Sequence, residues 1–301
     1  MEEWLAELKG EKEKGVLWDF LNVIGVVLGL FIAQIIGNSL IMQLMGSQPR
    51  IYRYLPLILG GNLLLNAIVL IGWIYLSIKV IEKRSLASIG LLSGKGTIKN
   101  YFKGALMGMV MVGITIMIIA LGGGMSFEWR GIDRSQYLSF GLIVLAWIVL
   151  SSSEEMLIRG YLLSRLGVRR GCAVGIMVSS ICYSLLHSLN IGSNWIAIVN
   201  IGLMSIFLGV YVLRTGNLWR ACGWHTAWNL VQGNILGLNV SGNQMGVAGE
   251  VWRGKMMSKN ALLTGGDFGI EASLATTLIM LAAIVFNLFI STDQFEDESI
   301  C

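Results

Sequence analysis

The chain has 301 residues, of which 55% are hydrophobic and only 13% are charged. Soluble domains carry roughly 25% charged residues, so this composition excludes an ordinary soluble protein and indicates an integral membrane protein. The net charge of +4 comes from basic residues in short segments between apolar runs, where they orient a chain in the bilayer. We therefore expect membrane lipid as a partner and no nucleic acid.

Apolar runs that approach the length of a membrane span recur along the whole chain. A span needs roughly 20 such residues. The runs cover about 16–45, 55–78, 103–121, 137–157, 171–189, 194–213, 217–237 and 270–290. We predict an all-α protein, a polytopic membrane bundle of about eight transmembrane helices. The Gly-rich segment 238–269 is expected to be an ordered outer loop, and its sequence indicates no role.

The distribution of Lys and Arg predicts the orientation. If the N-terminus is inside, most of the 22 basic residues fall in the N-terminal tail and in the loops after the second, fourth and sixth spans. Cytoplasmic loops carry an excess of Lys and Arg. We expect a multi-pass protein with the N-terminus and the C-terminus both in the cytoplasm.

Two acids and a base interrupt the end of the fourth run. Glu155 and Arg159 are one helical turn apart and can pair, whereas Glu154 is rotated by about 100° and can point into the bundle. A carboxylate in a poorly solvated cavity suits a general base. The alternative is an acidic pair that caps a helix end at the cytoplasmic surface.

The only two histidines of the chain also lie in apolar runs. Tyr183 and His187 are spaced to share one helical face, and so are His225 and Asn229. The second pair could stabilise an oxyanion, or hold a water or a metal. Each pair could equally be an interhelical polar contact.

Ionisable groups inside a bilayer need partners, so one shared cavity holding Glu154, His187, His225 and Asn229 is the simplest arrangement. Glu154 could deprotonate a water there, while the imidazoles and the amide stabilise the tetrahedral oxyanion. If zinc is bound, His187, His225 and Glu154 would be its ligands. Counting along straight helices puts His187 far from Glu154, so either the fourth helix extends past Arg159 or the fifth is displaced. We expect a funnel that opens to the cytoplasm.

The ordered motifs Glu154-Glu155-x-x-x-Arg159, Tyr183-x-x-x-His187 and His225-x-x-x-Asn229 resemble the CaaX protease and bacteriocin-processing (CPBP) family of intramembrane endopeptidases. The one departure is Tyr183, where the family usually has Phe. The resemblance implies a catalytic role for Glu154, His187, His225 and Asn229, with Glu155, Arg159 and Tyr183 in support. Members are described both as metalloproteases and as zinc-free glutamate proteases, so the cofactor is either zinc or none.

This resemblance divides the chain into N-terminal membrane helices with a cytoplasmic loop (1–135), a catalytic membrane core (136–292) and an acidic C-terminal tail (293–301). The implied activity is hydrolysis of a peptide bond in a membrane-associated or prenylated peptide by a Glu-activated water. One alternative is a non-catalytic membrane protein that binds a peptide or confers bacteriocin immunity. Another is a proton-coupled transporter, which would show broken helices and repeat symmetry.

Overall fold

The computed structural model describes the chain except for residues 1–3, 5–6, 9–12, 48–53, 92–95 and 290–301. The predicted acidic tail, 293–301, lies outside the described residues. The first half contains α2 (Val16–Ser47), α3 (Leu55–Tyr75), η3 (Leu76–Ile81), η4 (Leu86–Ile89), α4 (Thr97–Leu121), β1 (Met125–Trp129), η5 (Arg134–Gln136) and α5 (Tyr137–Glu155).

The second half begins with η6 (Met156–Leu163), α6 (Ser164–Arg170), α7 (Cys172–His187), α8 (Trp195–Thr215), α9 (Leu218–Leu230) and η7 (Val231–Ile235). It ends with η8 (Met245–Ala248), β2 (Trp252–Met256), α10 (Ala261–Thr264), η9 (Gly266–Phe268), η10 (Ile270–Ala272) and α11 (Leu274–Phe289).

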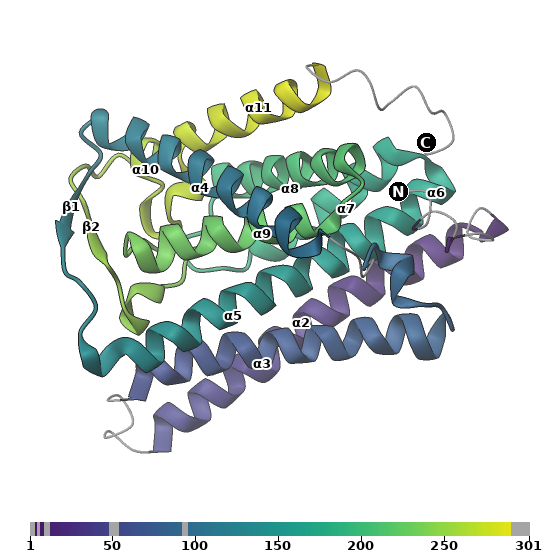
Figure 1. The fold of residues 1–301 in the computed structure, drawn as a ribbon, viewed down its shortest axis with the longest axis horizontal. Coiled ribbons are helices and arrows are strands. Elements are labelled where there is room, and N and C mark those ends of the chain that lie inside the picture. Colours follow the sequence, from purple (N-terminus) through teal and green to yellow (C-terminus); the bar gives the residue numbers. More distant parts are fainter. Residues whose placement is uncertain (1–3, 5–6, 9–12, 48–53, 92–95, 290–301) are drawn as a thin grey trace.

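The helices form one elongated bundle in which the chain runs back and forth along the long axis (Figure 1). Within the described residues, five helical stretches are long and apolar enough to cross a membrane: Val16–Gly37, Leu55–Ile81, Thr97–Leu121, Arg134–Arg170 and Trp195–Thr215. The shorter helices α7 and α11 are also apolar. Large apolar side chains such as Phe102, Leu106 and Val110 lie exposed along one face of α4, as they would against lipid. The predicted polytopic all-α bundle is confirmed.

The fourth predicted span was too short. It was expected to end near residue 157, directly after the glutamate pair, but the helix continues through η6 and α6 to Arg170. The apolar run ends earlier because Arg159 and Arg165 are buried and paired inside the protein instead of marking the membrane surface. Glu154 therefore lies in the interior of a long helix.

The segment 238–269 contains a strand that the sequence analysis missed. β2 pairs antiparallel with β1, with Phe127 opposite Gly254 and Trp129 opposite Trp252. The two strands close the end of the bundle that lies away from α6 (Figure 1). The segment is ordered, as expected.

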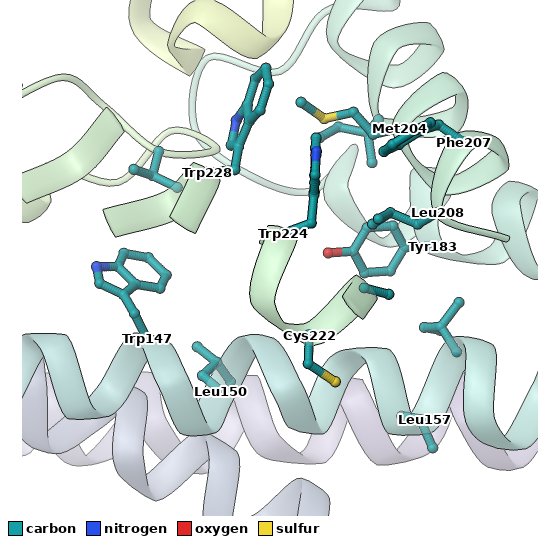
Figure 2. Close-up of a cluster of buried hydrophobic side chains, with 14 of the residues drawn as sticks. Trp147, Leu150, Leu157, Tyr183, Met204, Phe207, Leu208, Cys222, Trp224 and Trp228 are labelled. Carbon is teal, nitrogen blue, oxygen red and sulfur yellow. The ribbon is translucent and has the colours of Figure 1, made fainter. Parts of the chain in front are cut away.

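Glycines place α9 directly against α4. A methyl group at Gly104 or Gly108 would overlap with the main chain of α9, at Arg220 and Trp224 respectively. Small residues allow such close contact between membrane helices. On its other side α9 packs against α5 and α8, through an aromatic cluster that includes Trp224 and Trp228 (Figure 2). This packing fixes the rotation of α9 and hence the direction of His225 and Asn229.

Candidate active site

Glu154 and Glu155 close α5, and the helix continues as the π-helical segment η6. π-helical turns occur mostly as bulges inside α-helices, and they are frequent at functional sites. Here the segment contains Arg159 and leaves the helix unbroken. The two glutamates point to different neighbours, as their rotation about the helix axis predicts.

Glu155 is the structural member of the pair. Its Oε1 accepts a hydrogen bond from Arg159 Nη1 at 2.8 Å, and neither side chain has any exposed area. The same oxygen lies 2.8 Å from His225 Nδ1. A carboxylate can only accept here, so His225 donates through Nδ1. Glu155 therefore neutralises Arg159 and fixes the imidazole of His225 at once.

Glu154 faces the interior cavity. Its side chain is 18% exposed, and its Oε2 accepts a hydrogen bond from the Tyr183 hydroxyl at 2.8 Å. The same oxygen lies 4.0 Å from His225 Nε2. That separation is too long for a direct hydrogen bond but suits a bridging water.

Both imidazoles are held through Nδ1. His187 donates from Nδ1 to the Tyr183 carbonyl at 2.9 Å, and its ring lies against the Tyr183 ring with centroids 4.4 Å apart. This leaves the Nε2 atom of His187 available to the cavity, as it is in His225. The hydrogen bond at one ring nitrogen sets what the other can do.

Asn229 lies one turn after His225 on the same face of α9. Its Nδ2 donates to Ser151 Oγ at 3.3 Å, which leaves the second N–H of the amide unused by this contact. Trp224 and Trp228 lie on the other face and stack with centroids 5.0 Å apart. The tryptophans pack in the aromatic core, while His225 and Asn229 contact α5 through Glu155 and Ser151.

These side chains share one cavity of about 300 Å³, lined among others by Glu154, Tyr183, His187, His225, Asn229 and Glu271. The three motifs thus meet, and the length of the helix through Glu154 removes the difficulty that counting along straight helices raised. The lining continues through Ser241 and Met245 toward the end of the bundle that holds β1 and β2. Buried ion pairs of Arg165 with Glu82 and of Arg169 with Asp19 lie toward the end where α2 begins. The expected funnel to the cytoplasm stays a prediction.

Sequence reasoning missed Glu271. This carboxylate is 2% exposed and accepts hydrogen bonds from Gln232 Nε2 at 2.8 Å, Ser241 N at 2.9 Å and Ser241 Oγ at 3.0 Å. Burial raises the pKa of Glu271 to about 7, although these hydrogen bonds act in the opposite direction. The sequence did contain a signal for this residue, because Glu271 is an acid at the start of the last apolar run.

The described donor groups do not form a ready-made metal site. In the part of the chain that the structure describes, no three His, Cys, Asp or Glu side chains converge closely enough to hold an ion. Glu154 Oε2 is directed to the Tyr183 hydroxyl, and Glu155 Oε1 is shared by Arg159 and His225. The zinc set of His187, His225 and Glu154 stays a prediction, and no catalytic step below passes through zinc.

Residues 136–231 match the family model of the type II CAAX prenyl endopeptidases, described as Rce1-like. This segment is an Rce1-like domain of the CPBP family. It runs from the last residue of η5 to the first residue of η7 and contains all seven residues of the three motifs. Searches among curated proteins and among solved structures find no match.

The match supports a CaaX-type intramembrane protease at the family level. The matched segment does not include α2, α3 or Glu271. The cavity therefore has one wall from the Rce1-like domain and another from elements outside it.

Proposed function

We propose that this protein is a glutamate-type endopeptidase that cleaves a prenylated or otherwise membrane-associated peptide inside the bilayer. The observation that carries the proposal is the position of Glu154, in a shared cavity with its Oε2 held by Tyr183 and 4.0 Å from His225 Nε2. A water between these two groups would be oriented by both.

In the proposed reaction Glu154 takes a proton from this water as its oxygen attacks the scissile carbonyl carbon. The carbonyl π electrons move to oxygen, and the oxyanion is stabilised by N–H donors of Asn229 and of His187 or His225 as imidazolium. Glu154 then returns the proton to the amide nitrogen as the C–N bond breaks. The products are a carboxylic acid and an amine.

Apolar residues of the cavity support a substrate with a lipid chain. Leu30, Leu59, Leu63 and Leu70 of α2 and α3 line the side that faces the Glu154 helix. Transfer of each CH₂ group from water into such surroundings contributes about 0.8 kcal/mol. A prenyl group next to the scissile bond would gain from this surface, whereas a soluble peptide would not.

The test is cleavage of a fluorogenic farnesylated peptide ending in Cys-a-a-X by the purified protein in lipid vesicles. We expect Glu154→Gln to lower kcat by roughly 10²–10⁴-fold, the usual contribution of a general base. We also expect wild-type activity to survive chelation with 1,10-phenanthroline. Undiminished cleavage by Glu154→Gln would contradict the proposal. Binding without cleavage by the wild type would favour the peptide-binding alternative.

A further inference from the structure

Two carboxylates line the cavity and are bonded only to uncharged donors. Glu154 accepts a hydrogen bond from the Tyr183 hydroxyl. Glu271 accepts from the Gln232 amide and from the N–H and hydroxyl groups of Ser241. In the described part of the chain, neither acid is paired with an arginine or a lysine. Their charges therefore act on whatever molecule occupies the cavity.

The cavity offers no free cation to a ligand. Among the described residues that line it, Arg159 is the one arginine and none is a lysine. Arg159 has no exposed area and bonds Glu155 at 2.8 Å, so its charge is already balanced. His187 and His225 lie beside Glu154 and serve the proposed oxyanion. A carboxylate that leaves water without a cationic partner is costly, so a negative group of a ligand is disfavoured here.

Glu271 lies about two helical turns from His225. Gln232 follows His225 by seven residues in the helix formed by α9 and η7, so the two side chains share a face and are about 10 Å apart along the axis. Gln232 Nε2 donates to Glu271 Oε2 at 2.8 Å. An extended peptide advances about 3.3–3.4 Å per residue. A group about three residues from the scissile bond can therefore lie level with Glu271.

The wall beside Glu271 is also a place where the cavity reaches the surface. Asn243 lines the cavity and is exposed, and it follows Ser241 by two residues. Leu189 lines the cavity as well and is 67% exposed. We call Leu189 and Asn243 the rim. A peptide that enters over the rim passes Glu271 before its scissile bond reaches Glu154.

We propose that Glu271 is a specificity-determining residue, which selects peptides with a neutral or basic group, and no negative charge, about three residues from the scissile bond. A free terminal carboxylate at that distance counts as a negative charge, so the preferred substrate is a longer chain cut at an internal bond. Only 2% of Glu271 is exposed, so it acts through its charge and not through a direct bond. This inference rests on the proposed peptidase function and adds a residue outside the matched family segment.

The first test varies the charge of the substrate. Farnesylated peptides with an amidated C-terminus carry Glu, Gln or Lys at the third residue before or after the scissile bond. They are cleaved in phosphatidylcholine vesicles at pH 8, above the pKa of about 7 of Glu271. At one of the two positions, each added positive charge should lower KM roughly 3- to 10-fold, as expected for charges about 10 Å apart in a protein. The value of kcat should change by less than about 2-fold, because this attraction is equal in the ground and transition states.

The second test varies the charge of the protein. Glu271→Gln should bring the KM values of the Glu and Lys peptides close together, whereas a purely structural role would change all peptides alike. The matched control is Glu128→Gln, which removes one charge from β1, where Glu128 is 40% exposed and pairs with Lys255. It should leave the KM ranking unchanged. Asn243→Lys adds a cation at the exposed rim without breaking the Glu271 hydrogen bonds, and should lower KM for the Glu peptide and raise it for the Lys peptide.

Binding of the same peptides to the Glu154→Gln variant separates the two proposals, because it does not depend on cleavage. The Kd values should rank as the KM values do. Cleavage with equal KM for the Glu, Gln and Lys peptides at both positions, or a ranking that persists in Glu271→Gln, would overturn the specificity role and leave the peptidase proposal intact. If the wild type binds with the expected ranking but never cleaves, the peptidase proposal fails and the charge selection stands. Absence of any binding would overturn both.

Discussion

At the scale of single residues, two adjacent glutamates have separate environments. Glu155 has no exposed area and is bonded to both Arg159 and His225, whereas Glu154 faces the cavity and is bonded to a neutral hydroxyl. Removing one member of a buried ion pair leaves the other charge uncompensated. Stability should therefore depend on Glu155, and activity on both.

We accordingly expect Glu155→Gln to lower the free energy of unfolding by about 3–5 kcal/mol, the usual loss when a buried pair is broken. Glu154→Gln should change it by less than about 1 kcal/mol, because Glu154 has no cationic partner within hydrogen-bond distance. Thermal unfolding in detergent, followed by tryptophan fluorescence, compares the two. An equal loss of unfolding free energy in the two variants would show that the roles assigned to Glu154 and Glu155 are wrong.

At the scale of elements, hydrogen bonds to Glu271 connect the segments at one end of the cavity. Glu271 in η10 bonds Gln232 in η7 and Ser241 in the following loop. Asn200 of α8 donates to the Glu271 carbonyl at 2.7 Å. One buried acid thus holds three segments at the end of the cavity.

The burial of the Glu271 carboxyl group predicts that the stability of the protein depends on pH. The pKa of Glu271 is raised from 4.5 to about 7 by burial, so the folded state binds a proton more readily than the unfolded state between these values. Stability should fall by about 1.4 kcal/mol per pH unit as pH rises through this window, and level off above it. Glu271→Gln cannot titrate, so the Tm of the wild type relative to this variant should fall between pH 5 and pH 7. A constant difference across that range would contradict the assignment.

The sequence predicted the spans well and the loops poorly, for physical reasons. Apolar runs report burial in lipid directly, so most helix positions were found. The extension of α5 past Arg159 to Arg170 was only one of two alternatives, because buried, paired arginines look like surface charge in a sequence. The β1–β2 pair was missed because its register depends on partners more than 100 residues apart.

The candidate site was partly predictable. The i, i+4 spacings placed His225 with Asn229, and Tyr183 with His187, on common faces. The bond between His225 and Glu155, and the place of Glu271 in the cavity wall, depend on contacts between distant helices. No local pattern contains that information.

At the scale of the whole molecule, a buried charge network joins the N-terminal helices to the Rce1-like domain. Arg165 Nη2 bonds Glu82 Oε2 at 2.7 Å, with side-chain exposures of 0% and 1%. Tyr161 donates to Glu82 at 3.0 Å, and Arg165 also bonds Ser88. Burial alone would raise the pKa of Glu82, but Arg165 and Tyr161 together lower it, so the acid stays charged.

Glu82→Ala should therefore destabilise the protein by about 3–5 kcal/mol, because Arg165 would remain buried without its counter-charge. Combining it with Arg165→Met should recover a large part of this loss, since the uncompensated charge is removed. Unfolding of the single and double variants completes a double-mutant cycle. Additive losses would indicate that the two side chains do not act as a pair.

The most direct test of the account is chemical rescue of the carboxylate at position 154. In Glu154→Ala, single-turnover cleavage of the farnesylated peptide should fall to background. Added formate, small enough for the vacated volume, should restore it in a saturable manner. Formate should not accelerate the wild type or rescue a variant with Asn229→Ala. Wild-type rates in Glu154→Ala without formate would show that this glutamate does not activate the water.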